Sequence, residues 1–169
     1  MQNTQDRNRD LNLLRDKLSR IKVAMLTTID PDGAMRSRPM GAQEIDSEGR
    51  LWFFTNDESP KADSIDHEQR VNVAFSDEHH GLWVSISGHA KIVHDREKMK
   101  ELWSPMLKTW FPKGVDDPKI SLICIDLESA QIWDTPLNKM NLVLSMAKAF
   151  KKGEAMNPEG NSQKIDLHH

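Results

Sequence analysis

The spacing of hydrophobic positions changes from helical to strand-like near residue 22. Before that point apolar residues recur every three or four positions, which predicts an amphipathic opening helix. These residues are Leu11, Leu14, Leu18 and Ile21. After it, alternating or continuous apolar runs bounded by turn residues predict strands. The predicted strands cover residues 23–29, 34–45, 51–55, 71–75, 82–93, 120–127 and 131–134. Short turns join most of the early strands, so we expect an antiparallel sheet that closes into a barrel.

Helical periodicity returns at three places between and after the predicted strands. A short helix is expected over residues 60–67, followed later by a helical region over residues 95–110. Pro105 should kink or restart this second helix, because proline cannot donate the backbone hydrogen bond that the helix interior needs. A last amphipathic helix is expected over residues 140–150. The sequence therefore predicts a fold that is mainly β with flanking helices.

Length, charge and cysteine content narrow the class of protein. The 169 residues are expected to form one domain over residues 1–153, with a polar and mobile tail over residues 154–169. A net charge of −3 argues against a general nucleic-acid-binding protein. The sequence has no apolar run of membrane-spanning length and its polar start is not a signal peptide. Cys124 is the only cysteine, so we expect no intramolecular disulfide, a buried inert thiol and a cytoplasmic location.

A candidate anion site lies at the start of the predicted helix over residues 60–67. Ser59 suits the N-cap and Pro60 the first helical position, while Lys61 adds a charge beside the free N–H groups. Arg36 and Arg38 share one face of a neighbouring predicted strand and need a partner or solvent. Together these residues favour a place that holds a phosphate beside a flat ring. The simpler alternative is that they only start a helix, and for Arg36 we prefer a solvated surface position.

The order of the predicted elements, read together with six short motifs, resembles a known family. The motifs are Arg38-Pro-Met40, Phe54-Thr55-Asn56, Ser59-Pro-Lys61-Ala62, the segment 81–90, the segment 110–118 and Ile132-Trp133-Asp134. The chain is similar over residues 11–150 to the flavin-binding split barrel of the pyridoxamine 5′-phosphate oxidase-related superfamily. The likeness is greatest to the general stress protein branch of that superfamily. It implies an antiparallel split β-barrel of six to seven strands, of the FMN-binding type.

The resemblance also implies a cofactor and a partner. FMN is expected at the interface of a homodimer, where Arg38 and Lys61 would neutralise its phosphate and Thr55 and Ser59 would add hydrogen bonds. The full set of cofactor-binding positions implied by the resemblance is Arg38, Pro39, Met40, Gln43, Phe54, Thr55, Ser59, Lys61, Trp83 and Trp133. Met40 and Gln43 would approach the flavin ring and the ribityl chain. Pro39 also predicts an edge strand open to a ligand, because proline cannot donate to a sheet ladder.

Four aromatic residues are candidates for the site. Trp83 stands where the oxidase pattern has a glutamine near the flavin, so it either contacts the ring or packs in the core. Trp133 matches a tryptophan that lies beside the cofactor in the family. Trp110 and Phe111 would line the pocket or the dimer contact, with core packing as the alternative.

The expected activity is that of a flavoprotein with an unidentified small substrate. The residues after Trp133 do not supply the arginine and histidine pair with which the oxidase binds its substrate, so vitamin B6 oxidation is not expected. The leading hypothesis is an FMN-dependent oxidoreductase whose chemistry is carried by the flavin. The alternatives are a flavin-binding or flavin-buffering protein, a barrel adapted to a deazaflavin or haem, and a barrel without a cofactor.

The histidines give no reason to expect a metal site. His79 and His80 are adjacent in a predicted turn, and the other histidines do not have the spacing of metal ligands. The terminal pair His168 and His169 is either an added remnant or a polar end. From the resemblance, the expected partners are a second copy of the chain and a small molecule. The net charge and the absence of a membrane-spanning apolar run give no reason to expect nucleic acid or membrane as a partner.

Overall fold

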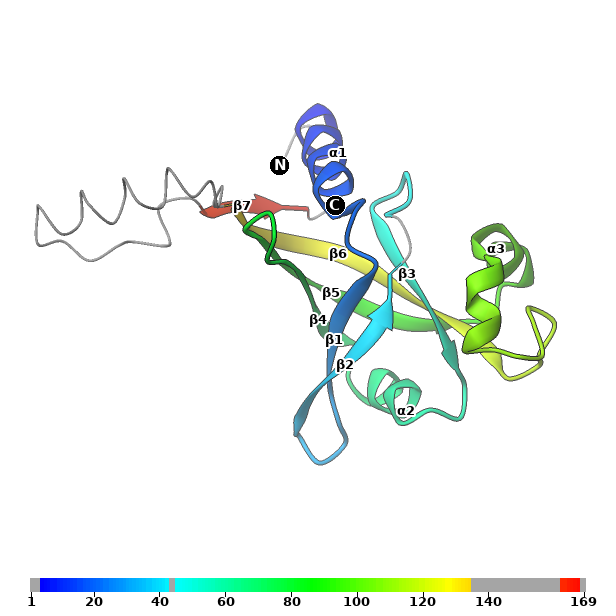
Figure 1. The fold of residues 1–169 in the computed structure, drawn as a ribbon. Coiled ribbons are helices and arrows are strands. Elements are labelled where there is room, and N and C mark those ends of the chain that lie inside the picture. The colour runs from blue at the N-terminus through cyan, green and yellow to red at the C-terminus, as the bar shows by residue number, and fades with distance from the viewer. Residues whose placement is uncertain (1–3, 43–44, 135–161, 168–169) are drawn as a thin grey trace, which may run out of the picture.

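A seven-stranded antiparallel sheet forms the framework of the protein (Figure 1). The computed structural model describes residues 4–42, 45–134 and 162–167. Its strands are β1 (Val23–Ile29), β2 (Met35–Gly41), β3 (Arg50–Asn56), β4 (Arg70–Asp77), β5 (Leu82–Val93), β6 (Ile120–Asp134) and β7 (Ser162–Asp166). Its helices are α1 (Thr4–Leu18), α2 (Pro60–His67) and α3 (Arg96–Leu102), with a 3₁₀ turn, η1, at Pro105–Thr109.

The sheet follows the order β2-β1-β4-β5-β6-β3, so β2 and β3 lie at the two ends of this path. The sheet curls until these two edge strands approach each other, which gives the split barrel that the sequence predicts. Strand β6 is long enough to pair along one edge with two different strands. Its first half pairs with β3 and its second half with β7. The edge position predicted from Pro39 is confirmed, since β2 pairs only with β1 among the described strands.

The barrel has two hydrophobic cores that share strand β3. Every residue from Leu51 to Thr55 is buried, because α1 and the barrel interior cover one face of β3 and α3 covers the other. The main core holds Leu51 and Phe53 together with three leucines of α1, Leu11, Leu14 and Leu18. Each leucine that is fully buried stabilises the fold by about 1.5–3 kcal/mol. The second core, under α3, contains Trp52, Phe54, Met99, Ile120, Leu122 and Cys124.

Two predicted elements differ from the observed ones in extent. Residues 120–127 and 131–134 form one continuous strand, β6, rather than two. The helical region after Asp95 breaks as Pro105 predicts, with α3 ending at Leu102 and η1 starting at Pro105. The Asp95 carboxylate accepts a hydrogen bond from the Lys98 backbone N–H and so caps α3.

The tail is the clearest correction to the sequence-based prediction. Residues 162–167 are ordered: β7 pairs with the second half of β6, and both Ile165 and Leu167 are buried in the main core. The expectation of a mobile tail is therefore wrong for these residues. The predicted helix over residues 140–150 and the predicted site residue Gln43 lie outside the described residues.

A glycine permits the close contact of the two longest strands. The register between β5 and β6 shifts at Ser87 and Gly88, which marks a β-bulge. A Cβ atom on Gly88 would lie 2.4 Å from the Asp126 carbonyl oxygen, a distance that no side chain can adopt. The bulge therefore depends on glycine at this position.

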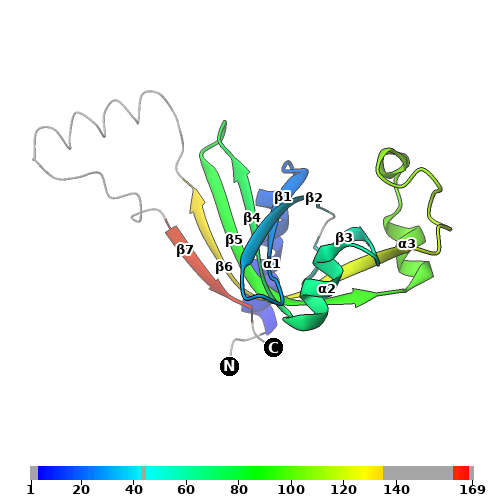
Figure 2. The same ribbon diagram turned by 90° about the horizontal axis from the view of Figure 1, so that it is seen from below.

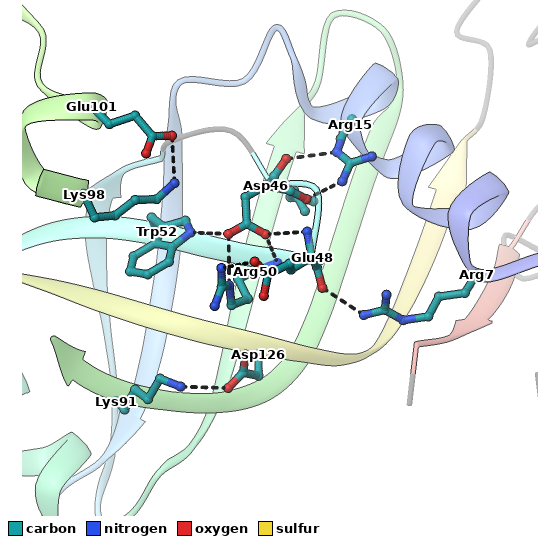
Figure 3. A network of polar contacts seen from close by, with 11 residues as sticks. Arg7, Arg15, Asp46, Glu48, Arg50, Trp52, Lys91, Lys98, Glu101 and Asp126 are labelled. Carbon is teal, nitrogen blue, oxygen red and sulfur yellow. Dashed lines mark hydrogen bonds and ion pairs between the residues drawn. The ribbon is translucent and has the colours of Figure 1, made fainter. Parts of the chain in front are cut away.

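A network of polar contacts centred on Asp46 ties α1, the β2–β3 connection and β3 together (Figure 3). One oxygen of the Asp46 carboxylate accepts from the backbone N–H groups of Glu48 and Arg50, at 3.0 and 2.9 Å. The other accepts from the Arg50 guanidinium and the Trp52 indole, at 3.0 and 2.9 Å. Burial of Asp46 would raise its pKa, but the hydrogen bonds from Arg50 and Trp52 outweigh it and lower the pKa. Arg15 on α1 reaches the same turn by donating to the Asp46 carbonyl.

The two ends of the described chain lie beside each other, as Figure 2 shows. The Arg7 guanidinium on α1 donates to the Leu167 carbonyl oxygen at 3.3 Å.

Among the described residues, no helix combines the length and the apolar character needed to cross a bilayer.

Candidate functional site

A cluster of three cations lies where β2 faces α2, at the lower end of the barrel in Figure 1. We name Arg36, Arg38 and Lys61 the cationic cluster. Arg36 and Arg38 lie on the face of β2 that also buries Met40, because side chains alternate along a strand. Lys61 is half-buried in the first turn of α2, and burial together with the charge of Arg38 lowers its pKa. Arg38 therefore lies close enough to Lys61 for the two charges to repel each other.

Asp30, directly after β1, joins the cationic cluster to α2. Its carboxylate accepts from the Ser64 hydroxyl at 2.7 Å, from Arg38 Nη2 at 3.4 Å and from Arg36 Nε. The hydrogen bond from Ser64 is the largest cause of the lowered pKa of Asp30. Burial acts in the opposite direction and is a smaller effect than this hydrogen bond, and the two arginines lower the pKa further. Arg38 is also fixed from the other side, because its Nη1 donates to the Thr28 hydroxyl at 2.7 Å.

The start of α2 leaves one backbone donor open. Ser59 takes the N-cap position with extended backbone angles and Pro60 follows at the first helical position, as the sequence predicts. The Ser59 hydroxyl does not cap the helix, however, but lies 3.2 Å from the hydroxyl of the buried Thr55. The Ser59 carbonyl oxygen already accepts from the backbone N–H groups of Ala62 and Asp63, at 2.9 and 3.5 Å. The Lys61 N–H is therefore the donor that this turn leaves for a ligand, at the positive end of the helix dipole.

Two tryptophans lie on the opposite, outer face of the sheet. Trp83 on β5 and Trp133 on β6 are directly paired, and with Val23 and Met25 of β1 they line a shallow cavity of about 270 Å³. We name these four residues the outer-face group. Trp83 is 38% exposed and Met25 40%, so the alternative of core packing is wrong for Trp83. Pro39 pairs with Met25.

The cationic cluster and the outer-face group of one chain are far apart. Arg38, Leu26, Val73 and Ile86 form one row across four strands. Trp83 lies three residues from Ile86, so it is roughly 17 Å from Arg38 measured along the sheet. The two groups also point to opposite faces, which places the full thickness of the sheet between them.

The remaining predicted positions have other surroundings. Met40 is buried in the main core, and the ring of Phe54 packs in the second core against Trp103 and Phe111, at ring-centre distances of 5.6 and 6.1 Å. The structure therefore does not bring the Phe54 ring together with the cationic cluster. Phe111 belongs to the second core, which removes the pocket interpretation for its ring. Trp110, in contrast, is 78% exposed.

Three residues of the site were missed by sequence reasoning. Asp30 was assigned to a turn, and the polar residues Thr28 and Ser64 were not singled out. Arg36, expected in solvent, is 56% exposed at its side chain but is paired with Asp30. The structure shows Thr28 buried on the inner face of β1, directly opposite Arg36 in the register. A polar residue at an inward position of a predicted strand was the available signal.

Comparison with known proteins agrees with this fold. A family model described as pyridoxamine 5′-phosphate oxidase like matches residues 9–157. Protein bli-3 of Neurospora crassa is 30% identical over 154 residues, which cover 85% of this chain and 74% of that protein. The structure assigned as general stress protein 26 from Jannaschia sp. is 27% identical with a TM-score of 0.72, covering 94% of this chain and 99% of that one. The general stress FMN/FAD binding protein of Xanthomonas citri is 32% identical with a TM-score of 0.60, covering 78% and 90%.

Proposed function

The chain belongs to the pyridoxamine 5′-phosphate oxidase-like family, and from this premise we propose that it is an FMN-binding flavoprotein of the general stress protein type. The cationic cluster holds the phosphate of FMN. The observation that carries this proposal is the residual positive charge where β2 meets α2. Arg36 and Arg38 share one half-buried carboxylate, Asp30, and the more exposed Asp32 lies 3.9 Å from Arg36. Lys61 has no ion pair among the described residues.

The chemistry of the donors fits a phosphate monoester. Arg38 supplies a planar set of N–H donors, and Lys61 supplies a mobile ammonium together with its backbone N–H in the first turn of α2. The hydroxyls of Thr55 and Ser59 lie at the same helix start. Such a set holds a compact dianion through charge and directed hydrogen bonds at once.

The flavin ring requires a second copy of the chain. A ligand with its phosphate on Arg38 cannot reach Trp83 or Trp133 of the same chain, because the sheet stands between them. In a homodimer the cationic cluster of one copy and the outer-face group of the other complete one site. The exposed apolar side chains of the outer face support this assembly, since Met35 is 72%, Val23 58%, Met25 40% and Trp83 38% exposed.

The flavin would supply redox chemistry toward an unidentified small substrate, with the protein providing binding and orientation. Anaerobic reduction of bound flavin by NADH or NADPH, faster than reduction of free FMN, would support an oxidoreductase. Reduction no faster than that of free FMN would favour a protein that holds flavin without a dedicated reaction. The single buried cysteine is consistent with a cytoplasmic location.

Equilibrium binding tests the phosphate assignment. We expect the Arg38→Ala, Lys61→Ala double variant to lose FMN affinity by at least about 100-fold, because each lost charged hydrogen bond is worth about 1.5–3 kcal/mol. Riboflavin, which lacks the phosphate, should bind the variant and the wild type alike. Lys108→Ala removes an exposed cation from η1 and serves as the matched control. An unchanged FMN affinity in the double variant refutes the assignment.

Mixing two defective variants tests the composite site. The Arg38→Ala, Lys61→Ala variant and a Trp83→Ala, Trp133→Ala variant should each bind FMN weakly alone. After exchange of subunits, a mixed dimer has one site with both defects and one site with neither, so tight binding returns to half of the sites in the mixed dimers. A mixture that recovers no tight site, although subunit exchange is verified, contradicts the composite site.

A further inference from the structure

We infer that Asp30 is a positioning residue whose carboxylate orients Arg36 and Arg38 to receive the phosphate of a ligand. The identity of that ligand as FMN rests on the proposed function. The contacts that fix the orientation belong to the chain itself, and inorganic phosphate can probe them without flavin.

The Asp30 carboxylate is held rigidly by α2. Its side chain is only 16% exposed, and the Ser64 hydroxyl that donates to it at 2.7 Å belongs to a residue that is 1% exposed. Ser64 lies on the inner side of α2, so the position of Asp30 is set by an element other than the one that carries the arginines. This hydrogen bond, together with the small exposed area of the carboxylate, favours the orientation in which Asp30 faces the arginines.

Arg38 is held in place by two hydrogen bonds and keeps other N–H groups free for a ligand. The guanidinium carries five N–H groups, of which one donates to Thr28 and one to Asp30. The remaining N–H groups stay available for a phosphate. The anchors therefore fix the plane of the guanidinium while leaving donors for a ligand, which is how positioning partners act on groups that bind.

Asp30 does not compete with the phosphate for the whole cluster. Two carboxylates, Asp30 and the more exposed Asp32, accompany three cations, so the cationic cluster keeps net positive charge with Asp30 in place. Without Asp30, only Asp32, 3.9 Å from Arg36, would offset the repulsion among Arg36, Arg38 and Lys61. Their side chains would then spread toward solvent, and ordering them again on binding would reduce affinity.

The test is the ratio of FMN to riboflavin affinity in Asp30→Asn, measured by flavin fluorescence. We expect FMN to bind about tenfold more weakly, by analogy with other positioning partners, while riboflavin affinity changes less than about twofold. Asp32→Asn is the matched control, because Asp32 also faces Arg36 but at 3.9 Å and with a side chain 65% exposed. It should leave both affinities unchanged. Ser64→Ala, which loosens the anchor and keeps the charge, should show a smaller loss that is again confined to FMN.

Tighter FMN binding by Asp30→Asn would identify Asp30 as a competitor and overturn the inference, as would an unchanged ratio of the two affinities. If Asp30→Asn does not fold, Ser64→Ala and Thr28→Val take its place with the same ratio as the readout. If the wild type binds no flavin, the proposed function fails, and inorganic phosphate then decides separately about Asp30. Phosphate should raise the melting temperature of the wild type more than that of Asp30→Asn, and equal rises would overturn the inference.

Discussion

Replacing Asp46 by asparagine should destabilise the protein far more than the loss of an ordinary surface charge. The Asp46 carboxylate accepts four hydrogen bonds, two from backbone N–H groups and two from the side chains of Arg50 and Trp52 (Figure 3). An asparagine oxygen can keep the two backbone bonds. Its NH₂ group then faces two donors with which it cannot bond, the Arg50 guanidinium and the Trp52 indole.

The two lost bonds set the expected magnitude. Both bonds are made to the charged carboxylate and each is worth about 1.5–3 kcal/mol, so the free energy of unfolding should fall by about 3–6 kcal/mol. For a domain of this size that corresponds to a fall in melting temperature of roughly 6–24 °C. The Asp46 side chain is 14% exposed, so solvent screens the pair only weakly.

Urea denaturation at pH 7, followed by circular dichroism and tryptophan fluorescence, measures this change. Asp126→Asn is the matched control, because Asp126 pairs with Lys91 at 3.4 Å through side chains that are 44% and 53% exposed. Such surface ion pairs contribute at most about 1 kcal/mol. If Asp46→Asn loses no more stability than Asp126→Asn, the structural role assigned to the Asp46 network is wrong.

Three further predictions concern stability and reactivity. The folded state lowers the pKa of Asp46, so the excess stability of the wild type over Asp46→Asn should hold above the ordinary carboxyl pKa of about 4 and shrink below it. Urea titrations from pH 7 to pH 3 measure this difference in stability. A difference that stays constant over this pH range would count against the prediction. Gly88→Ala should lower the free energy of unfolding by about 1–3 kcal/mol because its Cβ meets the Asp126 backbone, whereas Gly41→Ala, which has open space, should change it little. Cys124 is fully buried and burial raises its pKa to about 11. A thiol reagent at pH 8 should therefore modify it only after unfolding. Rapid labelling of the native protein would contradict the position of Cys124 in the second core.

Local signals in the sequence were enough for most of the elements. Pro39 placed β2 at an edge, and Pro105 separated α3 from η1, because both effects depend on a missing backbone N–H group. The apolar run over residues 120–127 correctly indicated a strand, and the structure covers both of its faces. The covering element, α3, could not be identified from the run itself, because that contact joins segments distant in the sequence.

The parts that were missed depend on non-local contacts. Residues 162–167 are polar except for Ile165 and Leu167, and only the pairing of β7 with β6 explains why these two residues point inward. Asp30 fitted a turn sequence completely, so nothing local indicated a second role beside Arg38. Motif resemblance brought Arg38 and Trp83 into one predicted site, but the register of the sheet separates them by face and by distance.

The contact between Arg7 and Leu167 joins residues 160 positions apart, so it bears on how the chain folds as it is synthesised. Helix α1 leaves the ribosome before all the described strands, yet Leu11 and Leu14 pack in a core that also contains Ile165 and Leu167. A nascent chain that ends before β7 has the helix but lacks part of the surface that buries its leucines. The part of their burial that Ile165 and Leu167 supply can therefore form only after β7 has emerged.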